Sequence, residues 1–198
     1  MSGTLPLPLF PSSLTIGSTT PTLVSTAHSL KRQVRSRGGH RWTFRLGWAG
    51  LTQDQWQDLF GFLSAQRGQY ETFEFTPRFQ NRGSWAGSPV ISGGSQTGRS
   101  VALEDFTAAA TNVARRGDFI RFGNHNKVYM VTADVSADGS GNATLSIEPA
   151  LFASPADGSS LTISQVPFRV GLTSDQLEVP LRAGPAIGSL ELDLVEVP

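Results

Sequence analysis

The segment from Arg41 to Phe75, RWTFRLGWAGLTQDQWQDLFGFLSAQRGQYETFEF, decides the fold of the N-terminal part of the chain. Its first eight residues alternate between polar and large apolar side chains. A period of two is typical of a β-strand with one buried face, because successive side chains point to opposite sides of a sheet. We therefore predict a strand over residues 41–48 that buries its four large apolar side chains, Trp42, Phe44, Leu46 and Trp48.

The residues after this strand predict one helix, over residues 53–67. Thr52 is a suitable N-cap, and Gln55 stands three residues later, where it completes a capping box. Leu51 before the cap and Trp56 inside the helix have the spacing of a hydrophobic staple. Both signals lie at the same end, so the start of the helix is well defined.

The apolar face and the end of this helix follow from the same segment. Arg67 falls in the predicted last turn, and Gly68 can adopt the left-handed conformation that terminates a helix. Residues 69–75 alternate again and predict a strand. The helical face has the spacing i, i+3, i+4, i+7 at Trp56, Leu59, Phe60 and Leu63. The predicted structural core of the segment consists of Trp42, Phe44, Trp56, Phe60 and Phe73.

Outside this segment the sequence indicates many short strands. Residues 1–20 are rich in proline, serine and threonine and predict an arm, and residues 21–29 predict a first strand. Residues 76–98 are rich in glycine, proline, serine and asparagine, which favours a linker. Further strands are predicted over residues 99–103, 118–122, 127–135, 143–148, 161–164, 168–172, 176–181 and 190–194. Short strands separated by turns are typical of a small barrel or sandwich.

The charge of the chain is zero overall but divided between its halves. Residues 1–100 carry ten Lys and Arg against four Asp and Glu, and residues 101–198 carry six against twelve. Six cations fall within fifteen positions that contain no acid: Lys31, Arg32, Arg35, Arg37, Arg41 and Arg45. Three interpretations fit: a surface for nucleic acid or an acidic partner, a solvated strand face, or a molecule whose opposite ends dock head to tail.

No motif in the sequence indicates catalysis, and we predict no catalytic, cofactor-binding or metal-binding residue. The chain has no cysteine, so disulfides and thiolate sites are excluded. Residues 93–100 resemble a phosphate loop but are followed by a predicted strand instead of a helix. Residues 134–145 begin like a calcium loop but lack the closing Glu. The three histidines lack ligand spacing, and His125 is expected to be exposed in a turn.

The sequence also lacks the signals that would direct the chain to a membrane. No run of about 18 apolar residues is present to span a bilayer. The N-terminus has no basic region before its apolar residues and is interrupted by prolines, so we expect no signal peptide.

Several of these stretches resemble the distal tail and minor tail proteins of long-tailed, siphovirus-type bacteriophages. The shared patterns are an RW-x-F strand, a helix beginning LT and containing L-x-x-F, and a following RG-x-x-x-x-F. Downstream, QTGRSVAL, RRGDFIRFGNHNKVYMVTADV and DGSGNATLSIEPAL are similar to the same proteins. The matching stretches lie between residues 40 and 170.

This resemblance implies a mainly β fold: a tail-type β-barrel with one helix, residues 1–83 and 167–198, and an inserted OB-like β domain, residues 84–166. It implies a homohexameric ring in the virion, made in the host cytoplasm, that connects the tail tube protein to the hub and tip or baseplate proteins. The candidate subunit contacts are Lys31, Arg32, Arg35 and Arg37. No cofactor and no membrane are implied.

Three alternatives remain open at this stage. The chain could be another minor tail or hub protein. It could instead be a β-barrel binding module, and the acids of residues 84–166 then favour an oligosaccharide, such as one on the host surface, over nucleic acid. The basic and aromatic residues that single-stranded nucleic acid would use there are Arg115, Arg116, Arg121, Phe122 and Tyr129. A tail-associated glycan hydrolase would need a carboxylate pair, which nothing in the sequence selects.

Overall fold

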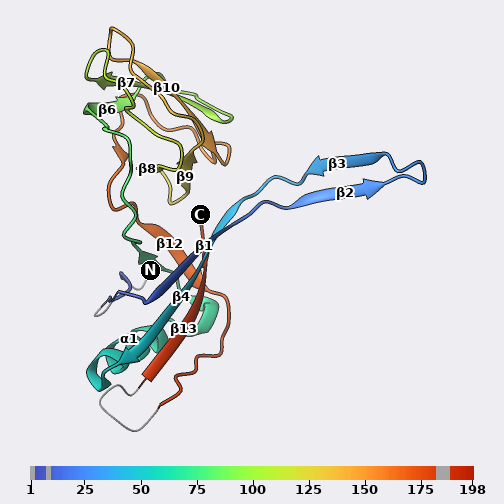
Figure 1. Ribbon diagram of the computed structural model, residues 1–198, viewed down its shortest axis with the longest axis vertical. Coiled ribbons are helices and arrows are strands. Elements are labelled where there is room, and N and C mark those ends of the chain that lie inside the picture. The colour runs from blue at the N-terminus through green and yellow to red at the C-terminus, as the bar shows by residue number, and fades with distance from the viewer. Residues whose placement is uncertain (1–2, 8–9, 182–187) are drawn as a thin grey trace. The chain divides into compact units, whose positions relative to one another are not determined.

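The computed structural model describes residues 3–7, 10–181 and 188–198 of the chain (Figure 1). The chain forms two compact units, Met1–Glu74 with Val170–Val197, and Phe75–Arg169. The inserted domain expected over residues 84–166 lies within the second unit, which begins nine residues earlier and ends three residues later, so residues 75–83 lie in this unit and not in the first. Among the described residues the fold is mainly β with one α-helix, as predicted.

The first unit is built on a five-stranded sheet in the order β1-β4-β13-β12-β5. The pairs β1–β4, β4–β13 and β13–β12 are antiparallel. The helix α1 lies along one face of this sheet (Figure 1). The strands are β1 (Ser13–Thr19), β4 (Arg41–Leu51), β5 (Phe73–Phe75), β12 (Phe168–Leu172) and β13 (Gly188–Glu196).

The predicted strand over residues 41–48 is confirmed and continues to Leu51 as β4. Its four large apolar side chains are buried, with no more than 4% of any of them exposed. Its neighbours alternate with them and face the other side. Burial of such side chains contributes about 2 kcal/mol each, so this strand anchors the unit. The four are Trp42, Phe44, Leu46 and Trp48.

The predicted helix is confirmed as α1 (Gln53–Ala65), and its capping box is present. The Thr52 hydroxyl accepts from the Gln55 backbone N–H, and the Gln55 Oε1 accepts from the Thr52 N–H at 3.0 Å. The predicted end was two residues too late. Arg67 already has a positive φ of 56°, so it lies beyond the last turn and Gly68 is a second left-handed residue.

On the apolar face of α1 the two leucines are buried more deeply than the two aromatic side chains. Leu59 and Leu63 are at most 1% exposed. Trp56 and Phe60, both predicted core residues, are half-buried and lie edge to face with ring centroids 6.1 Å apart. Of the predicted core, Phe73 on β5 is fully buried.

The predicted N-terminal arm is wrong for most of its length. Ser13–Thr19 forms β1, which pairs with β4 so that Leu14 stands opposite Leu46 and Ile16 opposite Phe44. The backbone N–H of Leu5 donates to the carbonyl of Glu74 on β5, and Leu5 is 3% exposed. Ser13–Thr19 contains no proline, and Leu14 and Ile16 alternate on the face of β1 that they share with Leu46 and Phe44, so this part of the segment can pair as a strand.

Two other predictions near this sheet need correction. Residues 69–75 are only partly extended, because Gly68–Tyr70 forms a 3-10 turn before β5. Residues 176–181 do not form the predicted strand. Leu181 forms a single antiparallel bridge with Gly188 at the start of β13, whereas β12 pairs with the other end of β13, between Leu194 and Glu196.

The second unit is a six-stranded sheet in the order β11-β8-β9-β10-β7-β6 that nearly closes on itself. The closing contacts join β6 to the segment before β11, where the Ile91 N–H donates to Ser159 at 3.0 Å and the Gly158 N–H donates to Ile91 at 2.9 Å. The strands are β6 (Gly87–Ile91), β7 (Ser100–Phe106), β8 (Phe119–Phe122), β9 (Val128–Val131), β10 (Ala143–Glu148) and β11 (Leu161–Thr162).

The predicted linker over residues 76–98 is wrong, because part of it builds this sheet. It contains β6, and it places Trp85 and Ile91 in the core of the second unit. Glycine and proline are compatible with an edge strand, where backbone groups need no second partner. The composition of residues 76–98 therefore predicted a linker where the structure has a strand.

Candidate assembly surface

The four predicted contact cations lie together on a separate two-stranded sheet, formed by β2 (Thr22–Thr26) and β3 (Arg32–Ser36). This hairpin is inserted between β1 and β4, and among the described residues its strands pair only with each other (Figure 1). Arg32 and Arg35 are on β3, Lys31 precedes it and Arg37 follows it. Every residue from 18 to 39 is exposed.

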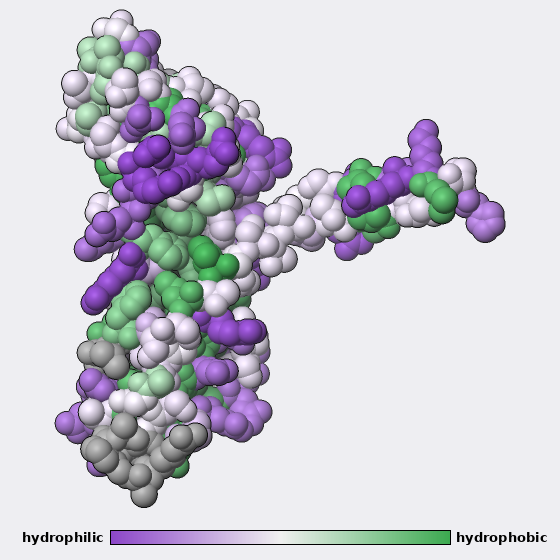
Figure 2. Space-filling view, in the orientation of Figure 1, coloured by the Kyte–Doolittle hydropathy of each residue, from purple (hydrophilic) through white to green (hydrophobic). Residues whose placement is uncertain are grey.

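The register of the hairpin gives its two faces different chemistry. Val24 stands opposite Val34, and these side chains are 46% and 55% exposed. Leu23 stands opposite Arg35 on the other face and is 50% exposed. Hydrophobic and hydrophilic side chains are therefore adjacent on the hairpin (Figure 2). A strand face that is merely solvated would carry few exposed apolar side chains, so the hairpin does not fit that interpretation of the cationic cluster.

Two glycines separate the hairpin from the sheet. The ladder between β1 and β4 ends at the pair of Thr19 with Arg41, and the hairpin ladder begins at Thr22 with Ser36. Between them Gly38 and Gly39 have φ values of 69° and 75°, in the left-handed region that favours glycine. The backbone changes direction here by using conformations that L-residues avoid.

A hairpin of this kind has little internal support. A lone two-stranded sheet is marginally stable in water and needs a third strand or a packed face. Here Val24, Val34 and Leu23 remain open on both faces, and Leu30 at the tip is 84% exposed. Exposed apolar groups beside unpaired strand edges mark a surface for association with another chain.

The structure does not assemble the residues predicted for ligand binding into a surface. Phe122 and Tyr129 are fully buried in the second unit, so neither ring can stack on a sugar or a base. The guanidinium of Arg116 donates to the Thr132 carbonyl, and that of Arg121 donates to Pro167. These side chains therefore support the fold of the second unit.

The sequence reasoning missed Asp118, which is 1% exposed at the start of β8. Its carboxylate accepts from the backbone N–H groups of Arg82, Gly83 and Arg115 at 2.7 to 3.0 Å, and from the Trp85 indole N–H at 3.1 Å. Four donors satisfy one buried carboxylate and fix the segment before β6. No local spacing could have revealed this group, because three of its partners lie more than thirty residues away.

His125 is half-buried, in contrast to the exposed position predicted for it. Its Nδ1 accepts from the Lys127 backbone N–H at 3.2 Å, and its Nε2 lies 3.2 Å from the Tyr129 hydroxyl. The ring also makes an edge contact with Phe152. Burial lowers the pKa of His125, because the imidazolium loses hydration.

Other classes of site find no support in the described part of the chain. Within residues 3–7, 10–181 and 188–198, no group of three His, Asp or Glu side chains is arranged to hold a metal ion. None of the helices in these ranges is long and apolar enough to cross a bilayer. The Asp138 carboxylate accepts from the Ser140 and Asn142 N–H groups, as in a turn.

Comparison with known proteins identifies the second unit. Residues 77–166 match the family model of the B domain of distal tail protein pb9, and this range covers nearly all of the compact unit Phe75–Arg169. This match supports a structural role for the chain in a bacteriophage tail. The similarity of the second unit to the B domain of distal tail protein pb9 confirms the predicted resemblance to distal tail proteins. No curated protein matches the chain.

Proposed function

We propose that this protein forms a homohexameric ring that connects the tail tube to the tip or baseplate of a siphovirus-type phage. The observation that carries the proposal is the match of residues 77–166 to a distal tail protein domain. A phage tail protein associates with other tail components. The partners proposed here are copies of the same chain, the tail tube protein and the hub or tip proteins.

The first unit supplies the features that self-association requires. In the part of the chain that the structure describes, no strand pairs with the outer edge of β1. The hairpin formed by β2 and β3 carries exposed apolar side chains and four cations. Unpaired strand edges and exposed apolar groups favour addition of a second chain.

We propose that the second unit acts as a structural module, with OB-like topology, and that the protein has no catalytic role. Its buried Asp118 is fully engaged by four donors and supports this interpretation. A saccharide-binding role has less support, because Phe122 and Tyr129 are buried. The chain is then made in the host cytoplasm and assembled into the virion.

Electron microscopy of the purified full-length chain tests the ring. We expect class averages with sixfold symmetry, and co-purification of the ring with the tail tube protein when both are expressed together. Threefold particles that bind only tip proteins would instead assign the chain to a hub-type role. The co-purification should survive removal of nucleic acid by nuclease treatment.

A further inference from the structure

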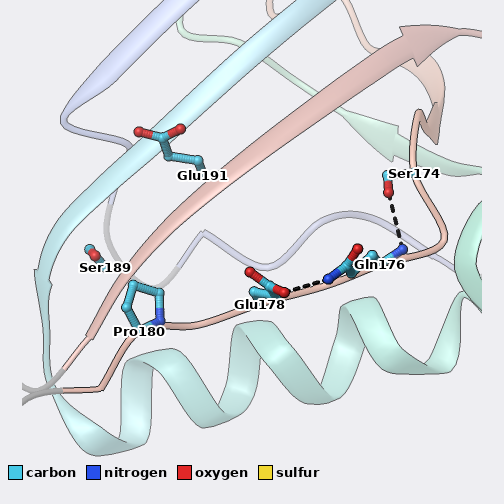
Figure 3. A pocket seen from close by; sticks show the side chains of 6 residues that line it. All are labelled: Ser174, Gln176, Glu178, Pro180, Ser189 and Glu191. Carbon is cyan, nitrogen blue, oxygen red and sulfur yellow. Dashed lines mark hydrogen bonds between the residues drawn. The ribbon is translucent and has the colours of Figure 1, made fainter.

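A polar groove lies in the first unit between β13 and the segment that follows β12 (Figure 3). Its volume is about 440 Å³. Glu191 comes from β13 and Glu178 from the opposite wall, where the Gln176 side-chain amide donates to it. The residues that line the groove are Ser174, Gln176, Glu178, Pro180, Ser189 and Glu191.

The groove is the acidic counterpart of the hairpin. Residues 173–198 contain five acids and one Arg, whereas residues 18–39 contain four cations and no acid. Glu178 and Glu191 are both exposed, and neither forms an ion pair within the described residues. Opposite charges on two surfaces of one molecule favour contact between copies and exclude pairing of like surfaces.

The hairpin of one chain is directed away from its own groove. Glu191 stands opposite Gly47 on β4, six residues from Arg41, where the hairpin begins. Arg35 precedes Arg41 by another six residues, so up to roughly 40 Å of backbone, with the bend at Gly38 and Gly39, separates Arg35 from Gly47. A contact between these two surfaces therefore joins different copies, head to tail, in the arrangement that closes into a ring.

We propose that the groove receives the hairpin of a neighbouring copy, with Arg35 and Arg37 facing Glu178 and Glu191. Arg35 and Arg37 are two residues apart in extended chain, and the Arg37 N–H still donates to Pro21 across the hairpin. They therefore share one face of the hairpin. Guanidinium groups suit carboxylates because they donate two parallel hydrogen bonds. This contact rests on the proposed ring and specifies how its subunits meet.

Cross-linking between two single-cysteine variants tests the contact directly, since the natural chain contains no cysteine. Full-length Arg35→Cys and Glu178→Cys chains are mixed and oxidised. We expect a disulfide-linked dimer that requires both variants. A mixture of Arg35→Cys with Gln57→Cys, whose new thiol is on the exposed side of α1, is the control and should give at least fivefold less product.

Charge reversal provides a second measurement that does not depend on thiol geometry. We expect Arg35→Glu to weaken self-association about tenfold at low salt, and less at high salt, where exposed charges are screened. Adding Glu178→Arg to the same chain should restore it. Arg67→Glu, a reversal at an exposed cation after α1 and outside the hairpin, is the matched control and should leave association unchanged.

The outcomes separate this contact from the ring itself. Two results together would overturn the groove contact and leave the ring proposal standing. The Arg35→Glu chain would still form hexamers, and the Arg35→Cys and Glu178→Cys chains would form no disulfide. A disulfide within one dilute chain carrying both cysteine substitutions would also overturn the groove contact, because the hairpin would then occupy its own groove. Both proposals would be overturned if the wild-type chain does not associate and the cysteine variants do not cross-link.

Discussion

At the scale of single residues, Asp118 is the most consequential side chain that the sequence did not reveal. It is buried and accepts four hydrogen bonds, three of them from the segment before β6. Asp118→Asn replaces an acceptor with a donor that faces those N–H groups. We expect a loss of about 3 kcal/mol in the free energy of unfolding, measured by urea titration. Asp105→Asn, an exposed change, should alter it by less than about 0.5 kcal/mol.

His125 makes the stability of the second unit depend on pH. Its pKa is lowered by burial, so the folded state favours the neutral ring, whereas the unfolded chain binds a proton near the ordinary value of 6.5. Stability should therefore decrease as the pH falls below about 6.5. Urea midpoints at pH 7.5 and pH 5 measure the change. His125→Gln should reduce the difference, while His28→Gln in the exposed hairpin turn should preserve it.

The residues that could be predicted are those whose partners are close in sequence. The capping box of Thr52 and Gln55 spans three residues, and the alternation that buries Trp42 and Phe44 spans a single strand. The cationic cluster could be predicted because its members are close together in sequence. Its position on a free hairpin could not be predicted, because that depends on which strands join the sheet.

At the scale of elements, α1 depends on its N-terminal cap. Thr52→Ala removes the hydroxyl that accepts from Gln55 and leaves an N–H at the helix start without its partner. We expect a loss of about 1 kcal/mol in the free energy of unfolding. Circular dichroism during thermal unfolding measures it. Gln57→Ala, on the exposed face, should be neutral, and equal losses for both variants would mean that the cap has no special role.

The predictions from sequence that missed or misplaced a strand all depend on pairing between segments that are distant in the chain. β1 joins β4 across the whole hairpin, and β6 lies inside a segment with the composition of a linker. Residues 176–181 show the opposite error, since alternation alone predicted a strand where the structure has a single bridge between Leu181 and Gly188 of β13. Periodicity indicates which residues can be extended, but it does not specify a partner.

At the scale of the whole molecule, one unit interrupts another in sequence. β5 and β12 belong to the same five-stranded sheet, and the entire six-stranded unit lies between them in the chain. The resemblance to distal tail proteins suggested an insertion, and the family match covers the inserted unit. The sheet unit carries both the cationic hairpin and the acidic groove, so one chain has the two surfaces that head-to-tail assembly needs.

The native mass of the full-length chain over a wide concentration range tests self-assembly most directly. The account predicts a discrete species of six times the 21.2 kDa chain mass. It also predicts that Arg35→Glu shifts the formation of this species to higher concentration. A discrete trimer, or a monomer that persists at every concentration even with the tail tube protein present, would contradict the proposed ring.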